Sequence, residues 1–358
     1  MTALTVSASI AGLGARTPIG RSVWASAAAA RAGLCGFREH PFMVDGAGEP
    51  MRVARAPWID WHVEGVDRFA ALLLPAIDEA LGELARAPAG TLPRLGLALA
   101  LPAWRPGLPT ALGEALFARI AARHATRFAA AAAFELGHAA AYPALDAVVG
   151  ALATGSLDAC LVGGVDSYLA PETLEWVESC DQLHGGGALN NAWGFVPGEA
   201  AGAVLLTTSE LPRRTGLAVL ADISAVGIGR EGKLIKTDDV CTGEGLTQAF
   251  RSVLGTLAPG ERVDDIFCDM NGEPYRADEY GFTALRTREH LRAAGEFSSP
   301  ADCWGDVGAA GGLLHVALAA IAHRKRYAKG PLSMVWGSSE SGERGAALIR
   351  KSPLERSD

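Results

Sequence analysis

Apolar residues along this chain fall into short continuous runs and longer stretches with helical spacing. A continuous apolar run is typical of a strand buried on both faces, whereas recurrence every three to four residues indicates a helix. Strands are predicted at residues 5–14, 94–102, 128–135, 158–164, 201–208, 217–229, 265–270, 332–336 and 345–350. Helices are predicted at residues 19–33, 66–84, 109–124, 139–154, 244–256, 277–293 and 307–325. Such alternation predicts an α/β fold.

Three segments lack this regularity. Residues 35–65 are predicted as a loop or cap, 166–195 as a long Gly-rich and aromatic loop, and 209–216 as a linker. Because strands and helices alternate on both sides of the linker, we expect two α/β halves. The predicted boundaries are 1–212 for the N-terminal half with its cap insertions, 213–352 for the C-terminal half and 353–358 for a tail.

Composition and charge narrow the function classes. The chain has 358 residues, 49% of them hydrophobic, which is enough for a large buried core. Its net charge is −8 without runs of like charge, which gives no sign of a nucleic-acid partner or a basic membrane surface. The one basic cluster, residues 323–329, follows a long apolar helix pattern and is predicted to be a solvated helix end.

The cysteines and the first residues of the sequence help to predict the cellular compartment and whether the protein binds a metal. Six cysteines lie far apart, with no C-x-x-C and no histidine at metal spacing, so we expect cytosolic thiols, a cytoplasmic protein and no metal. The first residues lack the basic region of a secretory signal. Polar residues interrupt the Ala-rich stretch 128–154, so no membrane span is expected. "GLGARTPIG" lacks the third glycine of a dinucleotide fingerprint, and no cofactor is predicted.

Four stretches together resemble the β-ketoacyl synthases of the thiolase superfamily. They are "IAGLGARTPIG", "ATGSLDACLVGGVDSY", "WGFVPGEAAGAVLL" and "GDVGAAGGLLHVALA", in the family's order and spanning nearly the whole chain. The resemblance implies a thiolase-like five-layered αβαβα fold of two similar halves, usually dimeric. It also implies a site where the halves meet, reached by an acyl chain on an acyl-carrier protein or coenzyme A.

The family's catalytic positions are altered in this sequence. Its chemistry uses a cysteine at a helix N-terminus, two histidines and a nearby lysine. Counting 26 residues back from Gly164 places His138 at the cysteine. "DMNGEPY" places Asn271 at the first histidine and Glu273 at a threonine, and "GDVGAAG" places Asp306 at the second histidine. "SSPADCWG" has no lysine, and the Gly-rich gate is reduced to "VWGSSESGERG".

Three roles for His138 are weighed. Imidazole accepts acyl groups, but acyl-imidazoles hydrolyse readily and store an acyl group poorly. A neutral His138 could act as a general base toward water. The third role is a hydrogen-bonded histidine in a vestigial pocket. A cation is disfavoured at the positive end of a helix, so we expect His138 to be neutral.

Further residues are candidates for the same pocket: Glu273, Arg276, Trp304, Cys303 and Glu340. Carboxylates at the histidine positions would repel a malonyl group, which argues against decarboxylative condensation. Cys303 is a candidate displaced nucleophile. Separately, Cys160 and Cys268 are expected to be inert core thiols, and His315 a satisfied core histidine.

The sequence thus predicts a ketosynthase-like protein that does not condense, acting as a non-catalytic partner or scaffold or as an acyl-thioester-binding protein. One alternative is a hydrolase or acyltransferase that uses His138. The other is an active 3-oxoacyl-[acyl-carrier-protein] synthase. Expected partners are a second copy or a related ketosynthase in a dimer, and an acyl-carrier protein or acyl-CoA.

Overall fold

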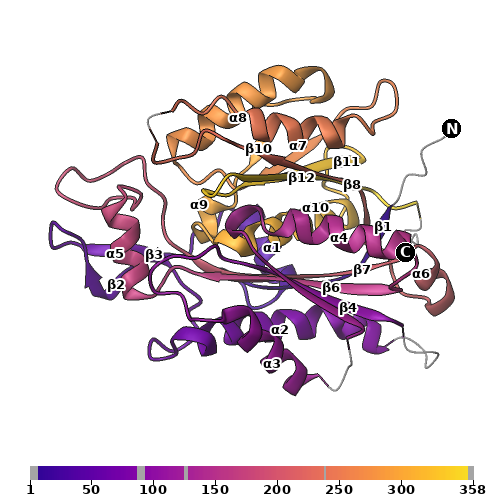
Figure 1. The fold of residues 1–358 in the computed structure, drawn as a ribbon, viewed down its shortest axis with the longest axis horizontal. Helices are drawn as coiled ribbons and strands as arrows, with labels where there is room; N and C mark the ends of the chain where they lie inside the picture. The colour runs from indigo at the N-terminus through magenta and orange to yellow at the C-terminus, as the bar shows by residue number, and fades with distance from the viewer. Residues whose placement is uncertain (1–6, 87–92, 125–127, 238, 354–358) are drawn as a thin grey trace.

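The computed structural model describes residues 7–86, 93–124, 128–237 and 239–353. Within these residues, the main sheet has ten strands in the order β10-β9-β11-β12-β8-β1-β7-β6-β4-β5 (Figure 1). Its strands are β1 (Ala8–Arg16), β4 (Leu95–Leu101), β5 (Ala130–Glu135), β6 (Ala159–Ser167), β7 (Glu199–Thr207), β8 (Ala221–Arg230), β9 (Asp265–Cys268), β10 (Phe297–Ser298), β11 (Leu332–Ser338) and β12 (Glu343–Arg350).

The sheet is built from two halves with the same strand order and directions. The order β1-β7-β6-β4-β5 is repeated as β8-β12-β11-β9-β10. In each half the first three strands pair antiparallel and the last three pair parallel. The halves join where Ala8 to Ile10 of β1 pairs with Ala221 to Ile223 of β8. The expected architecture of two similar halves is confirmed, although the repeat is weak at the level of single residues.

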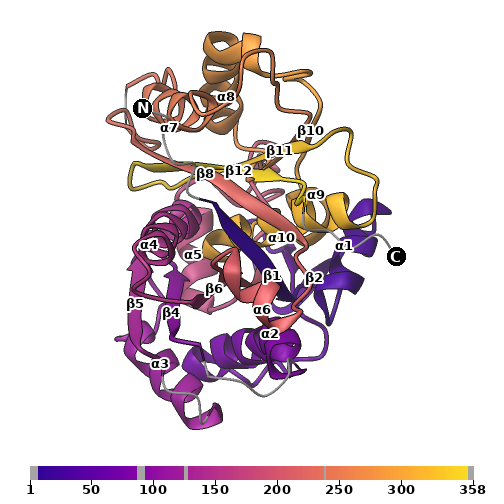
Figure 2. The same ribbon diagram turned by 90° about the vertical axis from the view of Figure 1, so that its right-hand side faces the viewer.

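Helices cover both outer faces of the sheet and fill the space between its halves. They are α1 (Val23–Arg31), α2 (Gly65–Arg86), α3 (Leu112–Arg123), α4 (Ala141–Ala153), α5 (Pro171–Ser179), α6 (Glu210–Thr215), α7 (Glu244–Leu254), α8 (Pro274–Thr287), α9 (Ala301–Trp304) and α10 (Gly311–Arg324). Helices α2 and α3 lie outside the first half, and α7 and α8 outside the second, while α4 and α10 lie between them (Figures 1 and 2). This gives the five layers expected from the sequence.

The largest apolar core surrounds the middle layer. Every residue of α10 from Gly311 to His323 is buried, as an all-round apolar sequence requires. Helix α4 packs against strands of both halves. At Gly345 in β12, a Cβ atom would lie 2.2 Å from Cγ of Tyr142 in α4, so only glycine allows this approach. Neither half therefore has a complete core of its own.

The structure corrects four details of the predicted elements. Residues 35–65, predicted as a loop or cap, contain the hairpin β2 (Phe37–Val44) and β3 (Pro50–Ala54). The predicted loop 166–195 includes α5, and the predicted linker forms α6, ended by Gly216 at a φ of 74°. The helix predicted at 277–293 is α8, which begins at Pro274 and ends at Thr287. Proline suits this first turn because it has no N–H to satisfy.

Two sequence predictions concern boundaries and membranes. The division after residue 212 stays a prediction, and residues 354–358 of the predicted tail lie outside the described residues. Among the described helices, none combines the length and apolar character needed to cross a bilayer.

Candidate functional site

His138 lies in the turn that joins a strand to a buried helix. Strand β5 ends at Glu135, a 3-10 turn covers Gly137–Ala139, and α4 begins at Ala141. Gly137 has a φ of 73°, a conformation that glycine adopts without strain. The turn places the His138 side chain, which is only 7% exposed, at the start of the helix.

Asp306 lies at the equivalent place in the second half. It precedes the 3-10 turn Gly308–Ala310, which leads into α10. Its N–H donates to the Val196 carbonyl over 2.8 Å, and its carbonyl accepts from the Gly198 N–H over 2.8 Å. A Cβ at Gly198 would lie 2.6 Å from the Trp304 carbonyl, so this approach needs glycine. The stretch "FVPGEA" therefore fixes Asp306 against the first half.

The three residues that the sequence resemblance assigns to the family's catalytic positions come together. His138 Nε2 lies 2.8 Å from Oδ1 and 2.9 Å from Oδ2 of Asp306. Asn271, which follows β9, donates from Nδ2 to Asp306 Oδ2 over 2.6 Å and to Glu273 Oε2 over 2.9 Å. The counting that assigned these positions thus leads to one cluster.

His138 and Asp306 form a buried pair whose charges favour each other. Burial lowers the pKa of His138, but the attraction and hydrogen bond from Asp306 outweigh it, and the net pKa is raised. Burial likewise raises the pKa of Asp306, yet His138 and Arg276 hold it well below its ordinary value. The direction of this pKa shift is opposite to the one expected from the helix start alone, because Asp306 favours the charged imidazole.

Arg276 provides a positive charge beside two further carboxylates of the cluster, those of Asp269 and Glu273. Its side chain is fully buried in the first turn of α8. It donates from NH1 to Asp269 Oδ2 over 2.8 Å and from Nε to Glu273 Oε2 over 3.2 Å. Burial lowers the pKa of Arg276, but Tyr275, Asp269 and Glu273 raise it well above its usual value. Arg276, Glu273 and Asp269 thus form one network of side chains.

Hydrogen bonds continue from Glu273 toward solvent. Gln182 Nε2 donates to Glu273 Oε1 over 2.7 Å and to Glu340 Oε1 over 2.6 Å. Lys236 Nζ lies 2.9 Å from the other oxygen of Glu340 and 4.3 Å from the Trp176 ring centroid. Burial raises the pKa of Glu340, but Lys236 and Gln182 outweigh it and the net pKa is lowered. The polar side chains between His138 and the surface are thus hydrogen-bonded to one another.

The cavity beside His138 is small. Its volume is about 20 Å³, close to the least space that a single water molecule occupies. Its lining residues are His138, Cys268, Asp269, Asn271, Ala301, Trp304, Gly305, Asp306, Val307, Gly308, Gly311 and His315. An acyl chain or a thioester needs several times this space.

A backbone N–H group at the start of α4 is also engaged in a hydrogen bond. The Ala139 N–H donates to Ser339 Oγ over 2.8 Å, and the same hydroxyl donates to the Leu136 carbonyl. In acyl transfer, free N–H groups at such a turn stabilise the oxyanion. Ser339, which follows β11 in the reduced gate segment, accepts a hydrogen bond from one of these groups, the Ala139 N–H.

The remaining sequence candidates lie in different places. Trp304 lines the His138 cavity. Glu273, Arg276 and Glu340 do not line it, but the hydrogen bonds described above connect them to Asn271. Cys303 does not line this cavity; its thiol donates to the Ala30 carbonyl over 3.7 Å. The interpretation of Cys303 as a displaced nucleophile bordering the pocket is therefore wrong.

Two cavity-lining residues were assigned to the core from the sequence. Cys268 does line the cavity, but burial raises the pKa of its thiol, which donates to the Ser298 carbonyl over 3.6 Å. His315 Nδ1 has no hydrogen-bond partner among the described residues, so His315 is not a fully satisfied core histidine. Burial lowers the pKa of His315 to about 4.

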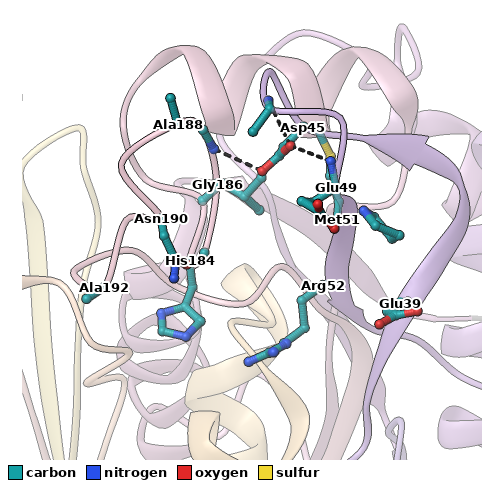
Figure 3. Close-up of a pocket in the computed structure, with 15 residues that line it drawn as sticks. Glu39, Asp45, Glu49, Met51, Arg52, His184, Gly186, Ala188, Asn190 and Ala192 are labelled. Carbon is teal, nitrogen blue, oxygen red and sulfur yellow. Dashed lines mark hydrogen bonds between the residues drawn. The ribbon is translucent and has the colours of Figure 1, made fainter.

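A larger cavity of about 620 Å³ lies away from His138, between the β2–β3 hairpin and residues 183–192 (Figure 3). Asp45 ties its two sides together, since it accepts from the Glu49 N–H over 2.9 Å and from the Gly187 N–H over 3.0 Å. Arg52 and His184 point into the space between the hairpin and the loop (Figure 3). Three carboxylates, from Glu39, Asp45 and Glu49, line it together with Arg52 and His184, so acidic side chains outnumber basic ones.

One group of possible metal ligands occurs in the described part of the chain: Glu231, Cys241 and Glu279. Glu231 accepts from the backbone N–H groups of Lys233 and Gly245, over 3.1 and 3.0 Å. Glu279 is paired with buried Arg344. The carboxylates of this group are therefore already satisfied by protein donors.

Comparisons with known proteins agree with this geometry. Residues 119–211 match the family model "Beta-ketoacyl synthase, N-terminal domain". No curated protein sequence matched the chain.

Similar solved structures span nearly the whole chain. One is a type II PKS acyl-carrier protein in complex with its ketosynthase bound to the hexaketide, with a TM-score of 0.79, 14% identity, and coverage of 97% of this chain and 99% of that one. The ketosynthase from module 6 of the bacillaene synthase of Bacillus subtilis 168 gives 0.76 and 17%, covering 97% and 72%. The ishigamide ketosynthase/chain length factor gives 0.71 and 19%, covering 96% and 99%.

The matched segment, residues 119–211, includes β5, the His138 turn, α4, β6 and the "FVPGEA" stretch that fixes Asp306. The resemblance found in the sequence is thus confirmed both by a family match and by fold. Residues 119–211 match the beta-ketoacyl synthase family model, and the chain as a whole has the thiolase-like fold of the ketosynthases.

Proposed function

We propose that the protein is a ketosynthase-like subunit that does not condense acyl thioesters and acts as the non-catalytic partner of another ketosynthase-fold chain. The observation that carries this proposal is the state of His138. The motif spacing assigns it to the nucleophile's position, and its Nε2 lies 2.8 Å from Asp306 Oδ1 beside a cavity of about 20 Å³. That centre has no thiolate and no space for a substrate.

Hydrolysis by His138 is the second candidate, favoured by the carboxylate that orients the imidazole. The cavity of about 20 Å³ beside His138, however, leaves no space for a thioester next to the imidazole. Acyl transfer to the imidazole meets the same obstacle, because the acyl group must also reach His138. The small cavity therefore favours the non-catalytic role over both alternatives.

The proposed partner surface is the free edge of β5. Among the described residues this strand ends the sheet and pairs with β4 alone, and its residues Ala130 to Ala133 are exposed. An exposed edge strand offers unpaired N–H and C=O groups to another strand, and alanine side chains let a second backbone approach closely. A related chain pairing here would extend the sheet. The ishigamide ketosynthase/chain length factor is among the similar structures and supports this class of partner.

The first test measures chemistry directly. The purified protein is incubated with acyl-CoA and with acyl-carrier thioesters, and intact mass is followed together with thioester concentration. We expect no acyl adduct and no loss of thioester beyond the rate in buffer, with a condensing ketosynthase as positive control. A covalent adduct would refute the proposal. Thioester loss that His138→Ala abolishes would instead establish the hydrolase.

The second test concerns the β5 edge. Charges on an edge strand oppose strand pairing, so Ala131→Lys with Ala133→Lys is expected to convert the dimer into monomers. The measurement is mass by light scattering, for the protein alone and co-expressed with a condensing ketosynthase of the same organism. Ala28→Lys, at an exposed position of α1, is the matched control and should leave the dimer intact. A dimer unaffected by the β5 lysines would exclude this edge as the interface.

A further inference from the structure

A cavity of about 440 Å³, here called the α1–α10 pocket, lies apart from the His138 cavity. Its lining residues are Ala27, Ala30, Arg31, Gly33, Asp265, Phe267, Ser298, Ser299, Pro300, Asp302, Cys303, Leu318, Ala322, Tyr327, Ala328 and Lys329. It shares no lining residue with the His138 cavity. Helix α9 separates the two, because Asp302 and Cys303 face this pocket while Ala301 and Trp304 face the other.

The walls of the α1–α10 pocket are mainly small and apolar. Ala27, Phe267, Leu318 and Ala322 are buried, and they come from α1, β9 and α10. Alanines on facing helices leave a space that larger side chains would fill. A volume of several hundred Å³ with apolar walls and few polar groups is typical of small-molecule sites.

A cation stands at the rim of this pocket. Arg31 ends α1, and its guanidinium carbon lies 4.0 Å from the Tyr327 ring centroid, a contact that holds the side chain over the pocket wall. In the described part of the chain, no carboxylate lies within ion-pair distance of Arg31. Lys329 is already paired with Glu296 over 3.0 Å. Arg31 is therefore available to an anionic group.

The basic segment 323–329 contributes residues to the wall of this pocket. The sequence predicted a solvated helix end, but Tyr327, Ala328 and Lys329 of this segment line the pocket. Asp302 also lines this pocket, and partial burial of its carboxyl group raises its pKa, so it opposes a bound anion less than an ordinary carboxylate. Asp265, the second carboxylate in the lining, accepts from the Lys329 N–H over 2.8 Å.

We propose that the α1–α10 pocket binds an amphipathic carboxylate, with its aliphatic chain between α1 and α10 and its carboxylate on Arg31. The apolar walls bury the chain, and the guanidinium of Arg31 supplies charge-assisted hydrogen bonds to the head group. This binding involves no covalent step and does not depend on the role of His138.

The test is calorimetric titration of the full chain with octanoate, octylamine and octanol, three probes of equal chain length. We expect octanoate to bind more tightly than the other two. Arg31→Gln is expected to weaken octanoate by about tenfold or more, because the hydrogen bonds lost involve charged groups. Ala30→Trp, which fills the pocket, is expected to abolish octanoate binding.

Arg21→Gln is the matched control, because Arg21 also lies over an aromatic ring, Trp58, at 5.6 Å, but outside this pocket. It should leave octanoate affinity unchanged. The proposal fails if octanoate does not bind, if octylamine binds more tightly, or if Arg31→Gln behaves like Arg21→Gln. Should Ala30→Trp not fold, the comparison of the two arginine variants still decides.

Discussion

Asp306→Asn is expected to lower the free energy of unfolding by about 3–5 kcal/mol, the usual result of removing one partner from a buried ion pair. Asp306 is 5% exposed and bonds to His138 Nε2, to Asn271 Nδ2 and to the Gly308 N–H over 2.8 Å. An amide in its place leaves His138 and Arg276 with less compensation and turns an NH₂ group toward other donors. The measurement is the denaturant midpoint and slope at pH 7.

Asp302→Asn is the matched control, since Asp302 lies four residues earlier, is exposed and belongs to no ion pair among the described residues. It should change stability by less than about 0.5 kcal/mol. Equal effects of the two substitutions would show that the His138–Asp306 pair contributes nothing. The double variant His138→Leu with Asp306→Leu should be more stable than Asp306→Asn, because well-packed apolar residues often replace a buried pair without loss.

The second large effect is expected from His315 at acidic pH. Burial lowers its pKa from 6.5 to about 4, so the folded chain keeps His315 neutral while the unfolded chain takes up a proton near pH 6.5. The unfolded state then binds more protons, and stability falls as pH falls from about 6.5 to 4. A shift of this size corresponds to about 3 kcal/mol over the whole interval.

Comparing the chain with His315→Leu isolates this effect, because His40 also has its pKa lowered to about 4 and contributes in the same direction. His138 has a raised pKa, so its contribution is complete below pH 6.5 and is lost as pH rises through its folded-state value. We expect His315→Leu to lose about 2–3 kcal/mol less stability than the parent between pH 7.5 and 4.5. His62→Leu, at an exposed position, should follow the parent. Parallel pH profiles for the parent and His315→Leu would contradict the prediction.

The fold could be predicted because its strands are buried on both faces. Such strands are continuous apolar runs in the sequence, and the strands β4, β6 and β7 were found in this way. The β2–β3 hairpin was not, because Pro41 interrupts it and its Phe42 and Val44 are exposed. Exposed apolar residues remove the alternation that normally marks a half-buried strand.

The cluster of His138, Asn271 and Asp306 could be predicted because motif spacing fixes backbone positions. The direction of the His138 pKa shift could not, since it depends on which side chains meet across the two halves. Gln182, Lys236 and Ser339 were missed because they come from loops and carry no local signal. The size of the cavity depends on how Trp304 and its neighbours pack, which spacing does not encode.

The hydrogen bonds around His138 run across the boundary between the two halves of the fold. His138 to Asp306, Ala139 to Ser339 and Gln182 to Glu340 each join a residue of the first half to one of the second. These hydrogen bonds can hold the two halves together whether or not the site catalyses a reaction. These polar residues would then be conserved because they stabilise the contact between the two halves. Conservation of His138 or Asp306 among close relatives would therefore not by itself indicate catalytic activity.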